Sequence, residues 1–160
     1  MRIVVISDSH GNYSALSKVI DRNTDADWIL HLGDGERDLD RYILANPMME
    51  RKIIHVAGNC DYNSLSPNSF VLPCLGHSIF FTHGHLYGVH SSLERIKAEA
   101  KKNNCDIILY GHTHVRFMSC EDGFHIMCPG SCSCPRDGKK PSFGHIDLSP
   151  SGIVMNIADV

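Results

Sequence analysis

The stretch Ile3–His10, which reads IVVISDSH, is the most informative part of the sequence for the fold. Its first half is a continuous apolar run rich in β-branched residues, which is typical of a strand buried on both faces. Its second half changes abruptly to a carboxylate and an imidazole. Strands of this kind occur in sheets that helices cover, so the stretch predicts an α/β sheet with polar groups at one strand end.

The same pattern recurs through the first two-thirds of the chain, where short apolar runs alternate with segments of helical periodicity. The expected strands are Ile3–Ser7, Trp28–Leu32, Lys52–Val56, Phe70–Leu75, Ser78–Thr82 and Asp106–Tyr110. The expected helices are Tyr13–Arg22, Arg37–Ala45 and a third, which opens at the capping-box spacing Ser91–Glu94 and ends near Asn103.

After Thr113 the pattern becomes entirely β. Two hairpins are expected on either side of the loop Pro129–Pro141: Val115–Cys120 with Phe124–Cys128, and Phe143–Leu148 with Ile153–Ala158. We therefore expect one domain, residues 1–160, of the α/β class, with two packed sheets and helices outside.

Composition excludes several classes of protein. The 160 residues carry a net charge of −3, and no block of Lys and Arg gives a strong nucleic-acid signal. No segment reaches the roughly 18 apolar residues that a membrane helix needs. The N-terminal apolar run leads straight into Asp8, unlike a signal peptide, and the seven cysteines are an odd number. Reduced thiols and a cytoplasmic location are expected.

Five of the expected strands end in residues that can bind a metal ion. Because ligands of α/β sheets gather at the carboxyl ends of strands, these residues should converge on one site. The candidates are Asp8, His10, Asp34, Asn59, His83, His112 and His114. They are too many for one ion and suffice for two if a carboxylate bridges, as in phosphoryl-transfer sites with ions about 3.5–4 Å apart. Because the donors are oxygen and nitrogen with no thiolate, Mn²⁺ or Fe fits at least as well as Zn²⁺, and Ni²⁺ is a further alternative.

The motifs DSH (8–10), GD (33–34), GNCD (58–61), a lone His83 and GHTH (111–114) resemble the calcineurin-like metallophosphoesterase superfamily, and within it the small YfcE-like phosphodiesterase branch. The resemblance implies a four-layer α/β-β/α sandwich of two mixed sheets flanked by helices. It also implies hydrolysis of a small phosphate diester by a hydroxide that bridges two ions. Asp8, His10, Asp34 and His114 would hold one ion, and Asp34, Asn59, His83 and His112 the other. Homodimers are common among such proteins.

One departure from the family pattern leaves the general acid open. Cys60 stands where many relatives have a histidine that assists the leaving group. His10, Asp61 and His85 are the candidates to replace it, so His10, Asn59 and Asp61 are the expected catalytic residues. The expected substrate contacts are Cys60, His85, Ser131 and Arg136.

Two other functions compete with a phosphodiesterase. One is a phosphomonoesterase of the same superfamily, and the other is a non-catalytic metal-binding scaffold like the retromer subunit that shares this fold. The scaffold has altered counterparts of Asp34 and Asn59, and both residues are present here, which favours an enzyme.

The remaining histidines and three clustered cysteines are expected to have structural roles rather than to bind metal. His31 and His55 are expected to be hydrogen-bonded strand residues. The expected surface or loop histidines are His77, His90, His125 and His145. Cys128, Cys132 and Cys134 match no common zinc spacing and are expected to be buried or partly buried thiols.

Overall fold

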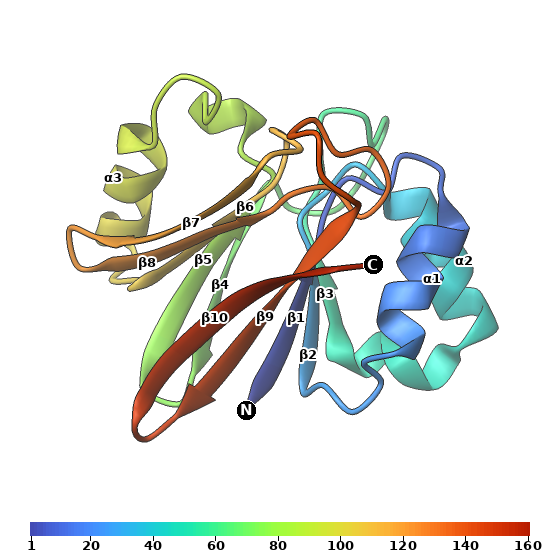
Figure 1. Ribbon diagram of the computed structural model, residues 1–160, viewed down its shortest axis with the longest axis horizontal. Helices are drawn as coiled ribbons and strands as arrows, with labels where there is room; N and C mark the ends of the chain where they lie inside the picture. Colours follow the sequence, from blue (N-terminus) through green and yellow to red (C-terminus); the bar gives the residue numbers. More distant parts are fainter.

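Two five-stranded sheets pack face to face in the computed structural model, which describes residues 1–160 (Figure 1). The first sheet has the order β10-β9-β1-β2-β3. Its strands are β1 (Arg2–Ile6), β2 (Trp28–His31), β3 (Ile53–His55), β9 (Ser142–Ser149) and β10 (Gly152–Asp159). The first three are parallel, and the C-terminal hairpin β9–β10 adds to them antiparallel.

The second sheet has the order β4-β5-β6-β8-β7. Its strands are β4 (Ser69–Cys74), β5 (His77–Thr82), β6 (Ile107–Tyr110), β7 (Arg116–Glu121) and β8 (Phe124–Pro129). Here β5, β6 and β8 are parallel, and the edge strands β4 and β7 are antiparallel to their neighbours.

Helices cover the outer face of each sheet. Helices α1 (Tyr13–Asp21) and α2 (Glu36–Ala45) lie on the first sheet, and α3 (Glu94–Lys102) lies on the second (Figure 1). The apolar core forms three corresponding layers, of which the central one, between the sheets, includes Val5 and Phe81. The predicted four-layer α/β-β/α sandwich is therefore confirmed. None of the helices is both long and apolar enough to cross a membrane.

The expected elements agree with the observed ones to within one or two residues at each end. Two 3-10 helices, Pro47–Lys52 and His85–Tyr87, were not expected. The capping box at Ser91–Glu94 does not form, because the cap of α3 is Leu93 and the Glu94 N–H bonds to the Ser92 hydroxyl.

His77, His125 and His145 lie within strands β5, β8 and β9, and each is partly buried. The expected strands Phe124–Cys128 and Phe143–Leu148 already contained His125 and His145. Only His77 changes place, because β5 begins one residue before the expected strand Ser78–Thr82.

The strand register places the loops that carry the candidate ligands at one edge of the sandwich. Ile6 at the end of β1 pairs with His31 at the end of β2, which in turn pairs with His55 at the end of β3. In the second sheet, Thr82 at the end of β5 pairs with Tyr110 at the end of β6. The five loops that follow these strands therefore leave their sheets at matching levels.

Candidate metal centre

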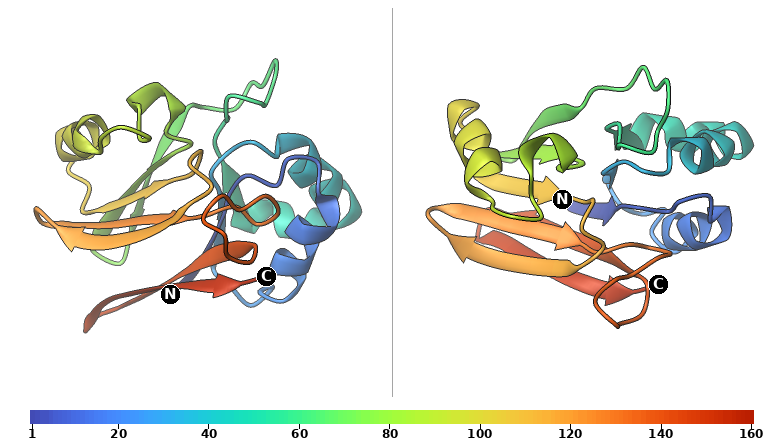
Figure 2. Two further views of the ribbon diagram at one scale, coloured as in Figure 1. Left: turned by 45° about the horizontal axis from the view of Figure 1, so that its top comes forward. Right: turned by 90° about the horizontal axis from the view of Figure 1, so that it is seen from above.

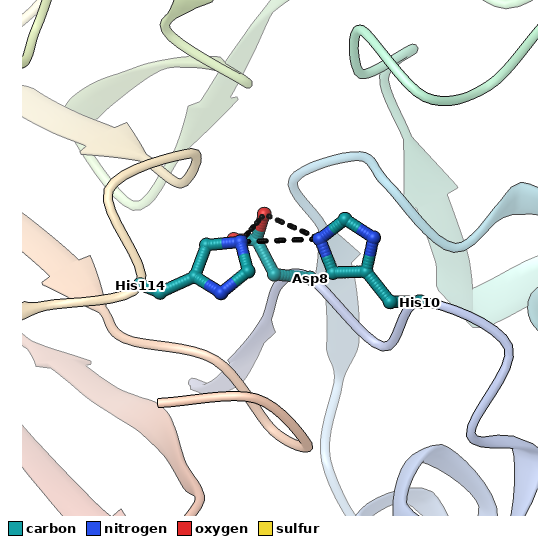
Figure 3. A group of neighbouring side chains, drawn as sticks. All are labelled: Asp8, His10 and His114. Atoms are coloured by element: carbon teal, nitrogen blue, oxygen red, sulfur yellow. Dashed lines mark hydrogen bonds and ion pairs between the residues drawn. The ribbon is translucent and has the colours of Figure 1, made fainter. Parts of the chain in front are cut away.

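Asp8, His10 and His114 meet although they come from opposite sheets (Figure 3). The Oδ1 atom of Asp8 lies 3.2 Å from Nε2 of His114 and 3.7 Å from Nε2 of His10. The two imidazole Nε2 atoms are 3.1 Å apart. These three atoms lie close enough together to bind a single ion.

Asp34 links this group to a second one. Its Oδ2 atom lies 3.6 Å from Nε2 of His10 and 3.4 Å from Nε2 of His83. The same His83 nitrogen is 3.1 Å from Oδ1 of Asn59. One carboxylate oxygen thus stands between two sets of donors, which is the position that a bridging ligand requires.

Backbone carbonyls orient two of the imidazoles. Nδ1 of His83 lies 2.7 Å from the carbonyl oxygen of Leu32, and Nδ1 of His114 lies 2.6 Å from that of Cys134. Each Nδ1 therefore carries the proton and donates it to the carbonyl, which leaves Nε2 as a lone-pair donor facing the other candidate ligands. This arrangement is usual for metal-binding histidines.

The neighbouring histidines favour the ionised form of both Asp8 and Asp34. Burial alone would raise the pKa of Asp8, but the neighbouring His10 and His114 outweigh it and hold that pKa far below its usual range. Burial is likewise outweighed at Asp34, where His83 lowers the pKa to about 2. Both side chains are therefore carboxylates at neutral pH, as metal ligands must be.

An unpartnered oxygen of Asp8 gives independent evidence that these residues can hold a metal ion. Asp8 is fully buried, its Oδ2 accepts hydrogen bonds from the Ser7 hydroxyl and the His112 N–H, and its Oδ1 has no hydrogen-bond partner. A buried carboxylate oxygen without a partner is costly, and a cation would satisfy it. The donor atoms of Asp8, Asp34 and His83 also lie within 4.8 Å of one another.

The backbone at the site is strained. Five of the seven candidate ligands have a positive φ: Asp8 (58°), His10 (47°), Asp34 (56°), His112 (68°) and His114 (59°). Such left-handed conformations are uncommon outside glycine and concentrate at functional sites. They turn each side chain out of its strand direction and toward the shared edge.

His112 stands apart from the tightest groups. Its backbone N–H bonds to Asp8, and its ring lies 5.0 Å from that of His83 and 4.7 Å from that of His90 between centroids. Burial and the two neighbouring imidazoles lower its pKa to about 4, so it is a neutral donor. The sequence did not predict the approach of His90, because nothing in a lone histidine of a turn signals it.

Asp61 has a role that the sequence did not predict. Its carboxylate accepts four backbone N–H bonds, from Asp34, Gly35, Glu36 and Gly58, at 2.7–3.0 Å. Both oxygens are occupied in fixing the loop that carries Asp34 and the start of α2. The geometry therefore argues against Asp61 as general acid and supports a positioning role.

Cys60 and His85 lie beside the candidate ligands. Burial, reinforced by Asp34 and Asp61, raises the pKa of the Cys60 thiol to about 11, so it stays protonated at neutral pH. The ring of His85 lies 5.4 Å from that of His83, and its buried Nδ1 has no partner. Both remain candidate substrate contacts.

Ser131 and Arg136 differ in exposure. The Ser131 hydroxyl is fully buried, donates to the carbonyl of Asp8 at 2.7 Å and accepts from the N–H groups of Ser133 and Cys134. It braces the ligand loop from a buried position, which supports a structural role over a substrate contact. Arg136 is exposed, and its N–H bonds to the carbonyl of His114, so its side chain remains a predicted substrate contact.

The histidines and cysteines that were expected to be structural lie outside the group of candidate ligands. His31 is fully buried, and its Nδ1 accepts from the N–H of Gly33. The His55 imidazole lies 2.6 Å from the Ser66 hydroxyl. Cys128 and Cys132 are buried and Cys134 is exposed. None of the three cysteines belongs to a group of potential metal ligands.

Comparison with known proteins gives consistent matches over nearly the whole chain. The family model described as the calcineurin-like phosphoesterase superfamily domain matches residues 1–151. The phosphodiesterase YfcE of Escherichia coli is 31% identical over 169 aligned positions, which cover 92% of this chain and 88% of YfcE.

Solved structures agree with this result. A crystal structure of a predicted phosphoesterase from Streptococcus pneumoniae superposes with a TM-score of 0.86 at 29% identity, covering 99% of this chain and 88% of that one. Vps29 of Entamoeba histolytica, solved with zinc, has a TM-score of 0.72 at 18% identity and covers 99% of both chains. At that identity the likeness to Vps29 shows the fold alone.

Proposed function

This chain belongs to the calcineurin-like phosphoesterase superfamily, and from that premise we propose that its strand-end residues hold two divalent ions, Mn²⁺ above all, for the hydrolysis of phosphate diesters. Family membership and the YfcE relative make it a metal-dependent phosphoester hydrolase. The identity of the ions and the residues that hold them are the proposed part.

The observation that supports this proposal most directly is the place of Asp34. Its Oδ2 lies between Nε2 of His10 and Nε2 of His83, at 3.6 and 3.4 Å. Asp8, His10, Asp34 and His114 would hold one ion, and Asp34, Asn59, His83 and His112 the other. The oxygen and nitrogen donors suit Mn²⁺, and the only sulfur nearby is the protonated thiol of Cys60.

Divalent ions at such a site supply polarisation of phosphoryl oxygens and activation of water at neutral pH. The protein contributes position. His10 is a quarter exposed and lines a cavity beside the donors, so its imidazole can face the leaving oxygen of a bound ester. The carbonyl-anchored His83 and the buried Asp8 hold their donor atoms in place before substrate binds, which preorganises the site.

Paired chromogenic assays test the proposal. Bis(p-nitrophenyl) phosphate should be cleaved much faster than p-nitrophenyl phosphate by protein loaded with Mn²⁺, and loading with Fe²⁺, Ni²⁺ or Zn²⁺ ranks the metals. Asp34→Asn should abolish the activity, whereas Asp40→Asn, an exposed change on α2, should retain it. A reversed substrate preference would identify a phosphomonoesterase, and inertness toward both esters would favour the scaffold function.

Two further predictions from the sequence remain proposals. A homodimer would show as a doubled mass in sedimentation equilibrium. A cytoplasmic location would show as fluorescence of a tagged chain throughout the cell interior.

A further inference from the structure

A cavity of about 280 Å³ opens directly beside the metal centre. Its lining includes the candidate ligands His10 and Asp34, and also Arg37 and Tyr62. The latter come from the start of α2 and from the loop between β3 and β4, which projects from the body of the protein (Figure 2). A chemical group held there would be adjacent to a phosphoryl group at the metal centre.

The acidic side chains that line the cavity are already bound to groups of the protein. Asp38 accepts a hydrogen bond from the Ser9 hydroxyl at 2.5 Å, and Asp61 accepts its four backbone N–H bonds. Glu36 accepts from the Ser66 hydroxyl at 2.6 Å. Their oxygens are therefore used in hydrogen bonds that hold the walls of the cavity.

Arg37 is the one basic side chain in the lining apart from His10, and it has no partner. It makes neither a side-chain hydrogen bond nor an ion pair, although it lies on a helix that carries several acids. Arg41, one turn further along α2, is engaged, since its guanidinium stacks over the Tyr13 ring at 4.2 Å. The flat guanidinium of Arg37 is therefore free to contact a ligand.

Tyr62 supplies an aromatic surface to the same cavity. Tyr62 is 78% exposed, and its ring packs against no other aromatic ring and no cation of the protein. The backbone on both sides of it is fixed, by the four bonds to Asp61 and by the bonds of Ser66 to Glu36 and His55. Because its neighbours in the loop are anchored, the backbone that carries the ring has less conformational freedom to lose when a ligand binds.

We infer that this cavity is a subsite for an aromatic substituent of the substrate, a nucleobase or an aryl ring, which packs against Tyr62 and Arg37. Aromatic rings and guanidinium groups stack on flat, π-rich rings of either kind. The inference rests on the proposed function, because the substituent is one of the two groups esterified to the phosphate. It assigns the enzyme to diesters that carry an aromatic group rather than to aliphatic ones.

Comparison of three diesters tests the inference. The three substrates are thymidylyl-thymidine, bis(p-nitrophenyl) phosphate and bis(glycerol) phosphate. Each is incubated with Mn²⁺-loaded protein, and the products are separated by chromatography. The kcat/KM of the thymidine diester relative to the glycerol diester should fall about tenfold in Tyr62→Ala, as expected when one stacked base loses its platform. Arg37→Ala should lower the same ratio several-fold, and Arg41→Ala, the matched control on α2, should leave it unchanged.

An unchanged ratio in both Tyr62→Ala and Arg37→Ala would overturn the inference. A parallel loss with the p-nitrophenyl diester would support a subsite for any aromatic ring, and a loss confined to thymidine a subsite for nucleobases. If wild type cleaves no diester, the proposed function fails, and calorimetry then tests the cavity alone. Thymidine monophosphate should bind the metal-loaded protein more tightly than glycerol phosphate does, and Tyr62→Ala should remove that difference. Equal affinities would overturn the subsite.

Discussion

The carboxylate of Asp61 accepts a hydrogen bond from the backbone N–H of Asp34, with Oδ2 and N 2.7 Å apart. This bond fixes the residue that stands between the two groups of candidate ligands. Asp61 also accepts hydrogen bonds from three neighbouring N–H groups. Its side chain bonds only to backbone groups and to none of the candidate donor atoms, and it sets the conformation of the whole loop.

Replacing Asp61 should therefore weaken the site without removing a ligand. In Asp61→Asn the amide NH₂ replaces one of the two oxygens, each of which accepts two N–H bonds, so two bonds are lost at a cost of about 1–3 kcal/mol of unfolding free energy or more. Metal affinity should fall about 10–100-fold, the range for residues that orient ligands. Metal titration of the variant checks this, and excess Mn²⁺ should restore much of kcat. A variant with normal metal affinity and no activity would instead identify Asp61 as a catalytic residue.

Loss of the shared carboxylate should affect both ions together. Asp34→Asn keeps the shape of the side chain but removes its charge. Both groups of candidate ligands then lose the anionic oxygen that they share. Elemental analysis after dialysis should find almost no Mn²⁺ in the variant. Retention of two tightly held ions would contradict the bridging role of Asp34.

Gly58 tests the close packing behind the site. A Cβ added there would lie 2.1 Å from Oδ1 and 2.4 Å from the backbone N of Asp34, both closer than atoms can approach. Gly58→Ala should displace Asp34, with a loss of activity of about 100-fold, the effect of an ångström-scale shift. Gly11→Ala is the control, since its Cβ meets nothing within 4 Å and adds only the strain of its φ of 81°. Equal activity losses in the two variants would refute this explanation.

His31 should make the metal-free protein sensitive to acid. Burial lowers its pKa from 6.5 to about 4, so the unfolded chain takes up a proton at a higher pH than the folded chain does. The contribution of His31 to the unfolding free energy is fully present above pH 6.5 and is lost as the pH falls toward 4. The loss from this residue is about 3 kcal/mol at most. Urea unfolding in EDTA should show a shallower decline between pH 6.5 and 4 in His31→Gln. Identical slopes in wild type and His31→Gln would exclude this role.

The sequence was sufficient to predict the sandwich and the edge where the site lies. Buried strands are apolar runs that end sharply, and parallel strands bring their carboxyl ends together, so the polar residues after Ile6, Leu32 and Tyr110 could be assigned to one edge. Those signals are local in the chain, and the register of parallel strands then follows from burial.

Features that depend on contacts between distant loops could not be predicted. The four bonds to Asp61 and the contacts among Glu36, His55 and Ser66 arise only when loops from different strands fold against each other. The approach of His90 to His112 is of the same kind, because it joins the turn before α3 to the loop after β6. No periodicity or spacing in a single sequence encodes such pairs.

The left-handed conformation of five candidate ligands has a consequence for the evolution of this chain. At each of Asp8, His10, Asp34, His112 and His114, glycine would adopt the observed φ with less strain. A glycine at any of these positions would therefore relieve backbone strain and remove a candidate ligand at the same time. On the proposed function, selection for turnover keeps the ligand, whereas selection for heat resistance alone favours relief of the strain.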